Sequence, residues 1–162
     1  FLAYVKARKF LTTITDISDI SGKKIYLHVG NLALSNADVT SIADDFVLIV
    51  QGNLTISDNL TDLEDQSVAF IATGGLNIEE AVDKLHGIYW ATAVDFASDT
   101  TLTATPLKIV GNIISKDPAD LTKRVRADET RPSLFVTLDM SPYLDLLPLL
   151  STRITEQEEL AQ

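Results

Sequence analysis

Cysteine is absent from the 162 residues, so neither a disulfide framework nor a thiolate metal site holds the fold together, and the redox compartment stays open. No apolar run reaches the roughly 18 residues that a transmembrane helix needs, and no cleavable signal is recognisable. Basic residues are also scarce, with 13 Lys and Arg against 23 Asp and Glu. The net charge of −10 repels phosphate backbones and anionic lipids, which argues against nucleic acid as a partner.

The first residue is Phe1 rather than Met, which suggests a processed protein or a piece of a longer one. Membrane contact is therefore expected only through a segment outside this sequence.

What the sequence does contain is a repeat. The stretch 48–56 (LIVQGNLTI) has counterparts 22 residues earlier, at 26–34 (YLHVGNLAL), and 22 residues later, at 70–78 (FIATGGLNI). A further copy, 107–114 (LKIVGNII), follows after a longer interval. Self-similarity at a period of about 20 to 50 residues indicates a repeat architecture. Apolar residues alternate or run together before the glycine and alternate after it, so each unit is expected to supply two short strands.

The remainder of each unit is polar, with two apolar residues three positions apart. These residues are expected to turn inward and close the third side of a coil: Val39 and Ile42, Leu60 and Leu63, and Val82 and Leu85. One coil cannot bury its apolar side chains alone, so coils should stack about 4.8 Å apart. The predicted fold class is therefore all-β, a right-handed parallel β-helix (β-solenoid) of about four to five coils with short N- and C-terminal caps.

The glycine between the two strands of each unit is expected to form a coil corner, because glycine accepts a sharp bend or a positive φ and allows close stacking. Asparagine follows it in three copies and tolerates the left-handed region. The predicted structural corners are Gly30, Asn31, Gly52, Asn53, Gly74, Gly111 and Asn112. Stacked asparagines could form a hydrogen-bonded ladder, which Gly75 would end. If Gly52 has a positive φ, Gly52→Val should be strained and Asn should be tolerated there.

Three segments are expected along the chain: an N-terminal arm or cap at 1–24, the β-helix with a C-terminal plug at 25–150, and a polar tail at 151–162. The proline-punctuated stretch 139–150 (DMSPYLDLLPLL) is expected to plug the open end of the core. The arm is basic where the rest is acidic, so it is a predicted assembly contact or the start of an anchor. The residues expected to make this contact are Phe1, Tyr4, Lys6, Arg8 and Lys9. A solvated helix that covers the open N-terminal end is the alternative.

At the Gly-Asn repeats and the closing SPYLDLLPLL, the chain resembles bacterial surface and pilus-associated proteins in which such coils form a right-handed β-helix. A looser likeness is to bactofilins, the polymer-forming β-helical cytoskeletal proteins, but the irregular spacing after Gly87 departs from their uniform coils. The resemblance spans roughly residues 25–150. It implies an extracellular or envelope-facing structural module with no catalytic residues to carry over.

Three groups of residues could carry enzymatic, metal-binding or sugar-binding chemistry, and each also has a simpler structural interpretation. Carbohydrate-active β-helix enzymes need clustered carboxylates, and the candidates are Asp58, Asp62, Glu64, Asp65, Glu79, Glu80 and Asp83; no positioned Arg pairs with them, which favours a solvated acidic face. His28 and His86 have no neighbouring ligand in sequence, so no metal site is predicted. Trp90, Tyr89 and Phe96 could stack on a sugar, but an aromatic stack in the core or under an arm at 98–105 is favoured.

The sequence therefore predicts a structural, non-catalytic module of a cell-surface or filament assembly, with adhesion as a further role, and no cofactor. Its expected partner is itself or another surface or filament subunit, with a glycan as an alternative ligand. The expected location is extracellular or in the cell envelope, with a cytoplasmic polymer as the alternative. The competing function is a carbohydrate-active enzyme or glycan-binding module.

Overall fold

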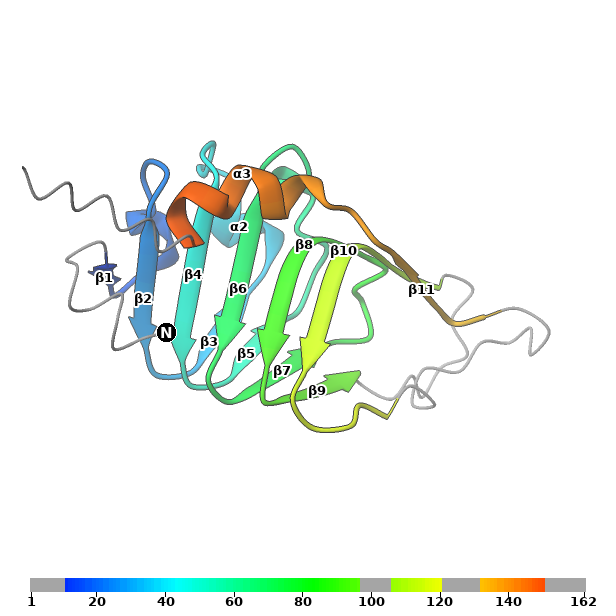
Figure 1. The fold of residues 1–162 in the computed structure, drawn as a ribbon. Helices are drawn as coiled ribbons and strands as arrows, with labels where there is room; N and C mark the ends of the chain where they lie inside the picture. Colours follow the sequence, from blue (N-terminus) through cyan, green and yellow to red (C-terminus); the bar gives the residue numbers. More distant parts are fainter. Residues whose placement is uncertain (1–10, 97–105, 121–131, 151–162) are drawn as a thin grey trace, which may run out of the picture.

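The structure, a computed structural model, describes residues 11–96, 106–120 and 132–150. Its strands form two parallel sheets that face each other across one core (Figure 1). The larger sheet has the strand order β1-β2-β4-β6-β8-β10-β11, and the smaller has the order β3-β5-β7-β9. The chain is thus a parallel β-solenoid of about four turns with a short helical cap, which confirms the predicted fold class.

The strands and helices have the following bounds. The larger sheet contains β1 (Leu11–Ile14), β2 (Ile25–Val29), β4 (Phe46–Gln51), β6 (Val68–Ala72), β8 (Lys84–Ala91), β10 (Leu107–Ser115) and β11 (Leu134–Thr137). The smaller sheet contains β3 (Leu32–Leu34), β5 (Leu54–Ile56), β7 (Gly75–Ile78) and β9 (Ala93–Phe96). The helices are η1 (Ile17–Asp19), α2 (Asn36–Val39), η2 (Thr61–Leu63) and α3 (Ser141–Leu150).

The register follows the repeat of the sequence. Ile25 pairs with Val47 in the larger sheet, and Leu54 pairs with Leu76 in the smaller sheet, so equivalent residues of successive units lie side by side. The larger sheet begins before the predicted start of the β-helix, because Leu11 of β1 pairs with Ile25 of β2.

The core is filled from three sides. The two sheets contribute alternate residues, and the six apolar residues predicted to close the third side are all buried. Leu85 is buried from the larger sheet and not from the third side, because it lies in β8 and pairs with Ile109 of β10, which corrects the prediction for that residue. An aromatic stack runs through successive coils: Phe46 meets Phe70 edge to face with ring centroids 5.6 Å apart, and Phe70 stacks on Tyr89 at 5.3 Å. Complete burial raises the pKa of Tyr89. Phe96 is also in the core, whereas Trp90 is only partly buried.

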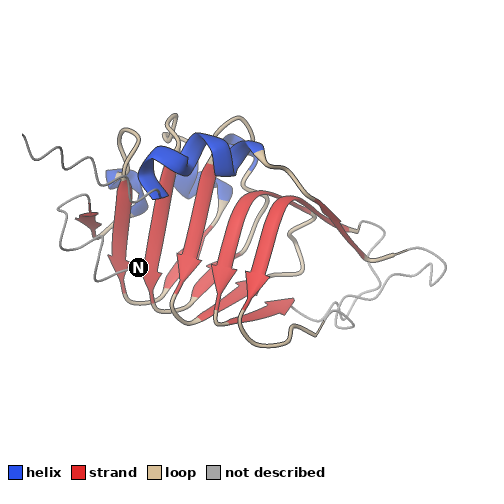
Figure 2. Ribbon diagram, in the orientation of Figure 1, coloured by secondary structure: helices blue, strands red, loops and turns tan. Residues whose placement is uncertain are grey.

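The C-terminal stretch does not plug the end of the core. Instead, α3 crosses the outer face of the larger sheet (Figure 2). Its Leu146 is fully buried in an apolar cluster with strand residues that point away from the core: Ile25, Leu27, Val47, Ile49, Ala69 and Ile88.

The reason for this position lies in the strands, which are apolar on both faces. In β4, Leu48 belongs to the core while Val47 and Ile49 belong to the outer cluster, so the outer face also needs a cover. Pro142 is compatible with the helix because the first turn leaves its N–H groups unbonded. Among the helices that the structure describes, none is long and apolar enough to span a membrane.

Candidate functional site

The glycines of the first three units lie one above another at a corner of the solenoid. The Gly74 N–H donates to the Gly52 carbonyl oxygen at 2.8 Å. A Cβ on Gly52 would lie 2.4 Å from the Gly30 carbonyl oxygen, although Gly30 is the only one of the three with a positive φ. Glycine is therefore needed at position 52 because the coils approach closely. The expectation that Asn is tolerated there is wrong, since any Cβ would clash.

The asparagines of this corner bond to the backbone of the next coil rather than to each other. The Asn53 N–H donates to Asn31 Oδ1 at 2.9 Å, and the Gly75 N–H donates to Asn53 Oδ1 at 2.7 Å. Gly75 has no side chain to continue the series, so the ladder ends at the third coil.

Gly111 and Asn112 are not at a corner, which corrects the prediction for the fourth copy. Both lie inside β10, where Gly111 pairs with Gly87 of β8. The chain turns later, at Asp117, whose N–H donates to the Thr92 carbonyl oxygen at 2.8 Å. Strands β8 and β10 are longer, with 8 and 9 residues, so Gly87 and Gly111 fall within the strands and not at their ends. Asn112 instead holds α3, because its Nδ2 donates to the Tyr143 hydroxyl at 2.6 Å.

The seven acidic candidates all lie in the described part of the chain, and no three of them form a group that could hold a metal ion. Asp83 accepts a hydrogen bond from Asn59 Nδ2 at 2.6 Å, and Glu64 pairs with Lys84 at 2.5 Å. None of the seven is among the described residues that line the hollow considered below.

The two histidines lie on different strands, His28 on β2 and His86 on β8. His86 Nε2 is 3.6 Å from Asp139 Oδ2. The Ser141 N–H, at 2.9 Å, is the main reason why the pKa of Asp139 is lowered, and His86 adds a smaller effect. Within residues 11–96, 106–120 and 132–150, no three His, Asp or Glu side chains form a group that could hold a metal ion.

The last strand, β11, is the C-terminal edge of the larger sheet, and we define this edge as residues 134–137. The Ser133 carbonyl oxygen accepts a hydrogen bond from the Leu107 N–H at 2.9 Å, so Ser133 directs its backbone toward β10. Successive residues of a strand direct their backbone N–H and C=O groups to opposite sides, and those of Leu134 and Val136 therefore point away from β10. Val136 pairs with Ile109, which is fully buried in the core, yet Val136 itself is 51% exposed. Among the described residues, none covers Val136 fully at this end of the core.

Further apolar side chains in and after β11 are exposed. Phe135 is 43% exposed, and Leu138 and Met140 are more than half exposed. At the opposite end of the solenoid stands β1 (Figure 1). The predicted N-terminal contact residues, 1–9, lie outside the described residues.

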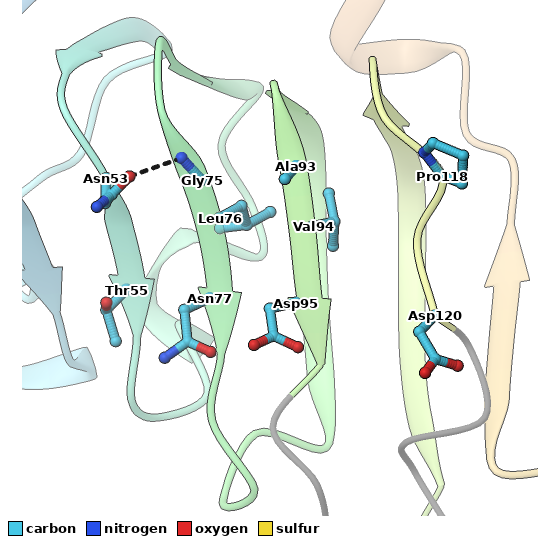
Figure 3. A pocket seen from close by; sticks show the side chains of 10 residues that line it. All are labelled: Asn53, Thr55, Gly75, Leu76, Asn77, Ala93, Val94, Asp95, Pro118 and Asp120. Carbon is cyan, nitrogen blue, oxygen red and sulfur yellow. Dashed lines mark hydrogen bonds between the residues drawn. The ribbon is translucent and has the colours of Figure 1, made fainter.

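A hollow of about 430 Å³ lies on the outer face of the smaller sheet, and we name it the outer trough (Figure 3). Thr55, Asn77 and Asp95 are register partners on β5, β7 and β9, and they form one row along it (Figure 3). Asp120, on the segment that follows β10, stands on its far side. The described lining is Asn53, Thr55, Gly75, Leu76, Asn77, Ala93, Val94, Asp95, Pro118 and Asp120.

Sequence reasoning missed the outer trough. Thr55, Asn77 and Asp95 occupy the same position in their units, between the two buried residues of the second strand. The alternation of buried and exposed residues could have identified this outward position. The alternation gave no signal for Asp120, which follows a change in coil length.

The comparisons with known proteins add no relative. No protein-family model matches the chain, and no curated protein sequence or solved structure is significantly similar to it.

Proposed function

We propose that this chain is a structural, non-catalytic β-solenoid module that assembles end to end with copies of itself, as a subunit of a filament or cell-surface structure. The observation that carries the proposal is the C-terminal edge, where no described strand pairs with the outward side of β11 and the core-facing Val136 is half exposed. Unpaired strand edges are templates for pairing with another chain, and proteins that do not use them usually protect them with charge, proline or a covering segment.

The geometry favours a second copy as the occupant. All strand pairs of the larger sheet are parallel, so β1 of another copy could add to β11 in the same direction and continue the sheet. β1 has exposed Thr12 and Thr13 on its surface and carries no charged residue. A contact between two different ends of the same molecule is heterologous, and it generates an open filament unless the rotation closes a ring.

Location in the cell envelope is part of this proposal, which rests on the resemblance to surface β-helix proteins. A bactofilin-like polymer inside the cell would use the same contact. The cell-surface and the intracellular form of this proposal differ in the location of the polymer, and both use the contact between β11 and β1.

The test compares two charge substitutions at exposed apolar positions. Val136→Lys puts a charge into the C-terminal edge, whereas Leu144→Lys puts the same charge on α3, where Leu144 is 67% exposed. Light scattering after size exclusion and negative-stain electron microscopy would measure assembly, and circular dichroism would establish that both variants fold. We expect end-to-end oligomers for the parent chain and for Leu144→Lys, and monomers for Val136→Lys. A parent chain that stays monomeric at high concentration would refute the proposal, as would unchanged assembly in Val136→Lys.

A further inference from the structure

We infer that the outer trough binds a neutral, polyhydroxylated ligand, namely an uncharged sugar chain, and that it does so without cleaving it. This inference goes beyond the assembly proposal, because the trough lies on the smaller sheet and the C-terminal edge belongs to the larger one.

The row along the trough offers both donors and acceptors. Within the described part of the chain, neither the Thr55 hydroxyl nor the Asn77 amide is hydrogen-bonded to the protein, and both are partly exposed. Asp95 and Asp120 each have another interaction, but a carboxylate has about four acceptor sites and keeps capacity for a ligand hydroxyl. A sugar hydroxyl both donates and accepts, so it can satisfy a hydroxyl, an amide and a carboxylate in turn.

Charge excludes the other common polar ligands. No described lining residue is Lys, Arg or His, two are aspartates, and the whole chain carries a net charge of −10. Phosphates, carboxylates and acidic glycans would be repelled. The carboxylates Asp95 and Asp120 instead suit hydroxyl groups, to which charge-assisted hydrogen bonds are stronger than neutral ones.

The shape indicates an extended ligand. Thr55, Asn77 and Asp95 recur on neighbouring strands, so their polar groups repeat about every 4.8 Å across the sheet. Gly75 and Ala93 keep the surface beside this row low, and the Pro118 ring supplies an apolar wall. A chain of sugar units lying across the strands would present hydroxyls to the row and C–H groups to this wall.

The test starts with an array of neutral oligosaccharides, followed by calorimetric titration and amide NMR shifts with the best binder. We expect shifts at Asn77 and Asp95, and a dissociation constant weakened roughly tenfold or more by Thr55→Ala and by Asn77→Ala. The matched control is Thr13→Ala, which removes an exposed hydroxyl from β1 and should leave affinity unchanged. Repeating the titration with Val136→Lys separates this inference from assembly, since a monomeric solenoid keeps its trough.

Three results would overturn the inference. The first is that no neutral oligosaccharide binds at millimolar concentration. The second is that binding survives both trough substitutions. The third is that only calcium chloride shifts the amides of Asp95 and Asp120, reversibly with a chelator, which would make the trough a cation site.

Discussion

Gly52→Ala adds a single methyl group at the point where two coils come closest. That Cβ would lie 2.4 Å from the Gly30 carbonyl oxygen and 2.6 Å from its carbon, and backbone atoms cannot turn aside as a side-chain tip can. Overpacking usually costs about 1–3 kcal/mol, and the backbone obstacle places this variant at about 3 kcal/mol. Each kcal/mol lowers Tm by about 2–4 °C in a domain of this size. We therefore expect Tm to fall by about 6–12 °C.

Gly75→Ala is the matched control, because it makes the same change near the corner of the next coil. Its Cβ would lie 3.6 Å from Asn53 Oδ1, an ordinary contact, and its φ is not in the left-handed region. Ala should therefore be neutral there, or stabilising by about 0.4–1 kcal/mol through the unfolded chain. Urea unfolding followed by circular dichroism measures both variants. Equal destabilisation by the two substitutions would refute close coil approach as the reason for glycine at position 52.

Two further predictions concern charge and the outer helix. Burial alone would raise the pKa of Asp45, but the Lys23 ammonium at 2.8 Å and the Ser67 N–H at 2.9 Å lower it overall. The Asp45 carboxylate therefore stabilises the fold above the ordinary carboxyl pKa of about 3.9, and this stabilisation is lost as pH falls through the lower pKa of the folded state. Asp45→Asn should then make the unfolding free energy depend less on pH in the acid range. An unchanged dependence of the unfolding free energy on pH would contradict this. Leu146→Ala should cost about 2–5 kcal/mol, whereas Leu147→Ala, at a position 55% exposed, should stay within about 0.5 kcal/mol in the same denaturation assay. Similar losses would show that α3 does not dock through Leu146.

The coil period could be predicted because the same position recurs in each unit. Gly30, Gly52 and Gly74 mark equal intervals, and equal intervals put equivalent residues of parallel strands in register, as Ile25 and Val47 are. The period also located the third side in the first two units, because Val39 and Leu60 hold matching places in the polar half.

The cover over the larger sheet was not predicted, although its signal was present. The unbroken apolar run from Val47 to Val50 identifies a strand, and it also means that both faces of β4 are buried. The prolines of 139–150 do not prevent a helix, because Pro142 lies in the first turn of α3 and Pro148 near its end, where they disturb few hydrogen bonds.

The outer trough and the open edge depend on tertiary placement. Asp120 lies on the far side of the trough because β10 is longer and the chain turns only at Asp117. No local sequence pattern indicates that the turn comes later in this coil. No described strand follows β11 in the larger sheet, and the apolar helix α3 packs onto another face of the same sheet. Local periodicity cannot distinguish a helix that covers the outer face of the larger sheet from a plug at the end of the core, since both bury leucines.

End-to-end assembly is tested most directly by crosslinking between the two edges. The chain has no cysteine, so Thr13→Cys on β1 and Thr137→Cys on β11 each introduce one thiol at an exposed position. The two variants would be mixed and treated with a short bismaleimide. Pairing of β11 with β1 of another copy predicts that the heterodimer is the main crosslinked product. Homodimers of either variant in equal or greater yield, or no crosslink at concentrations where oligomers form, would contradict it.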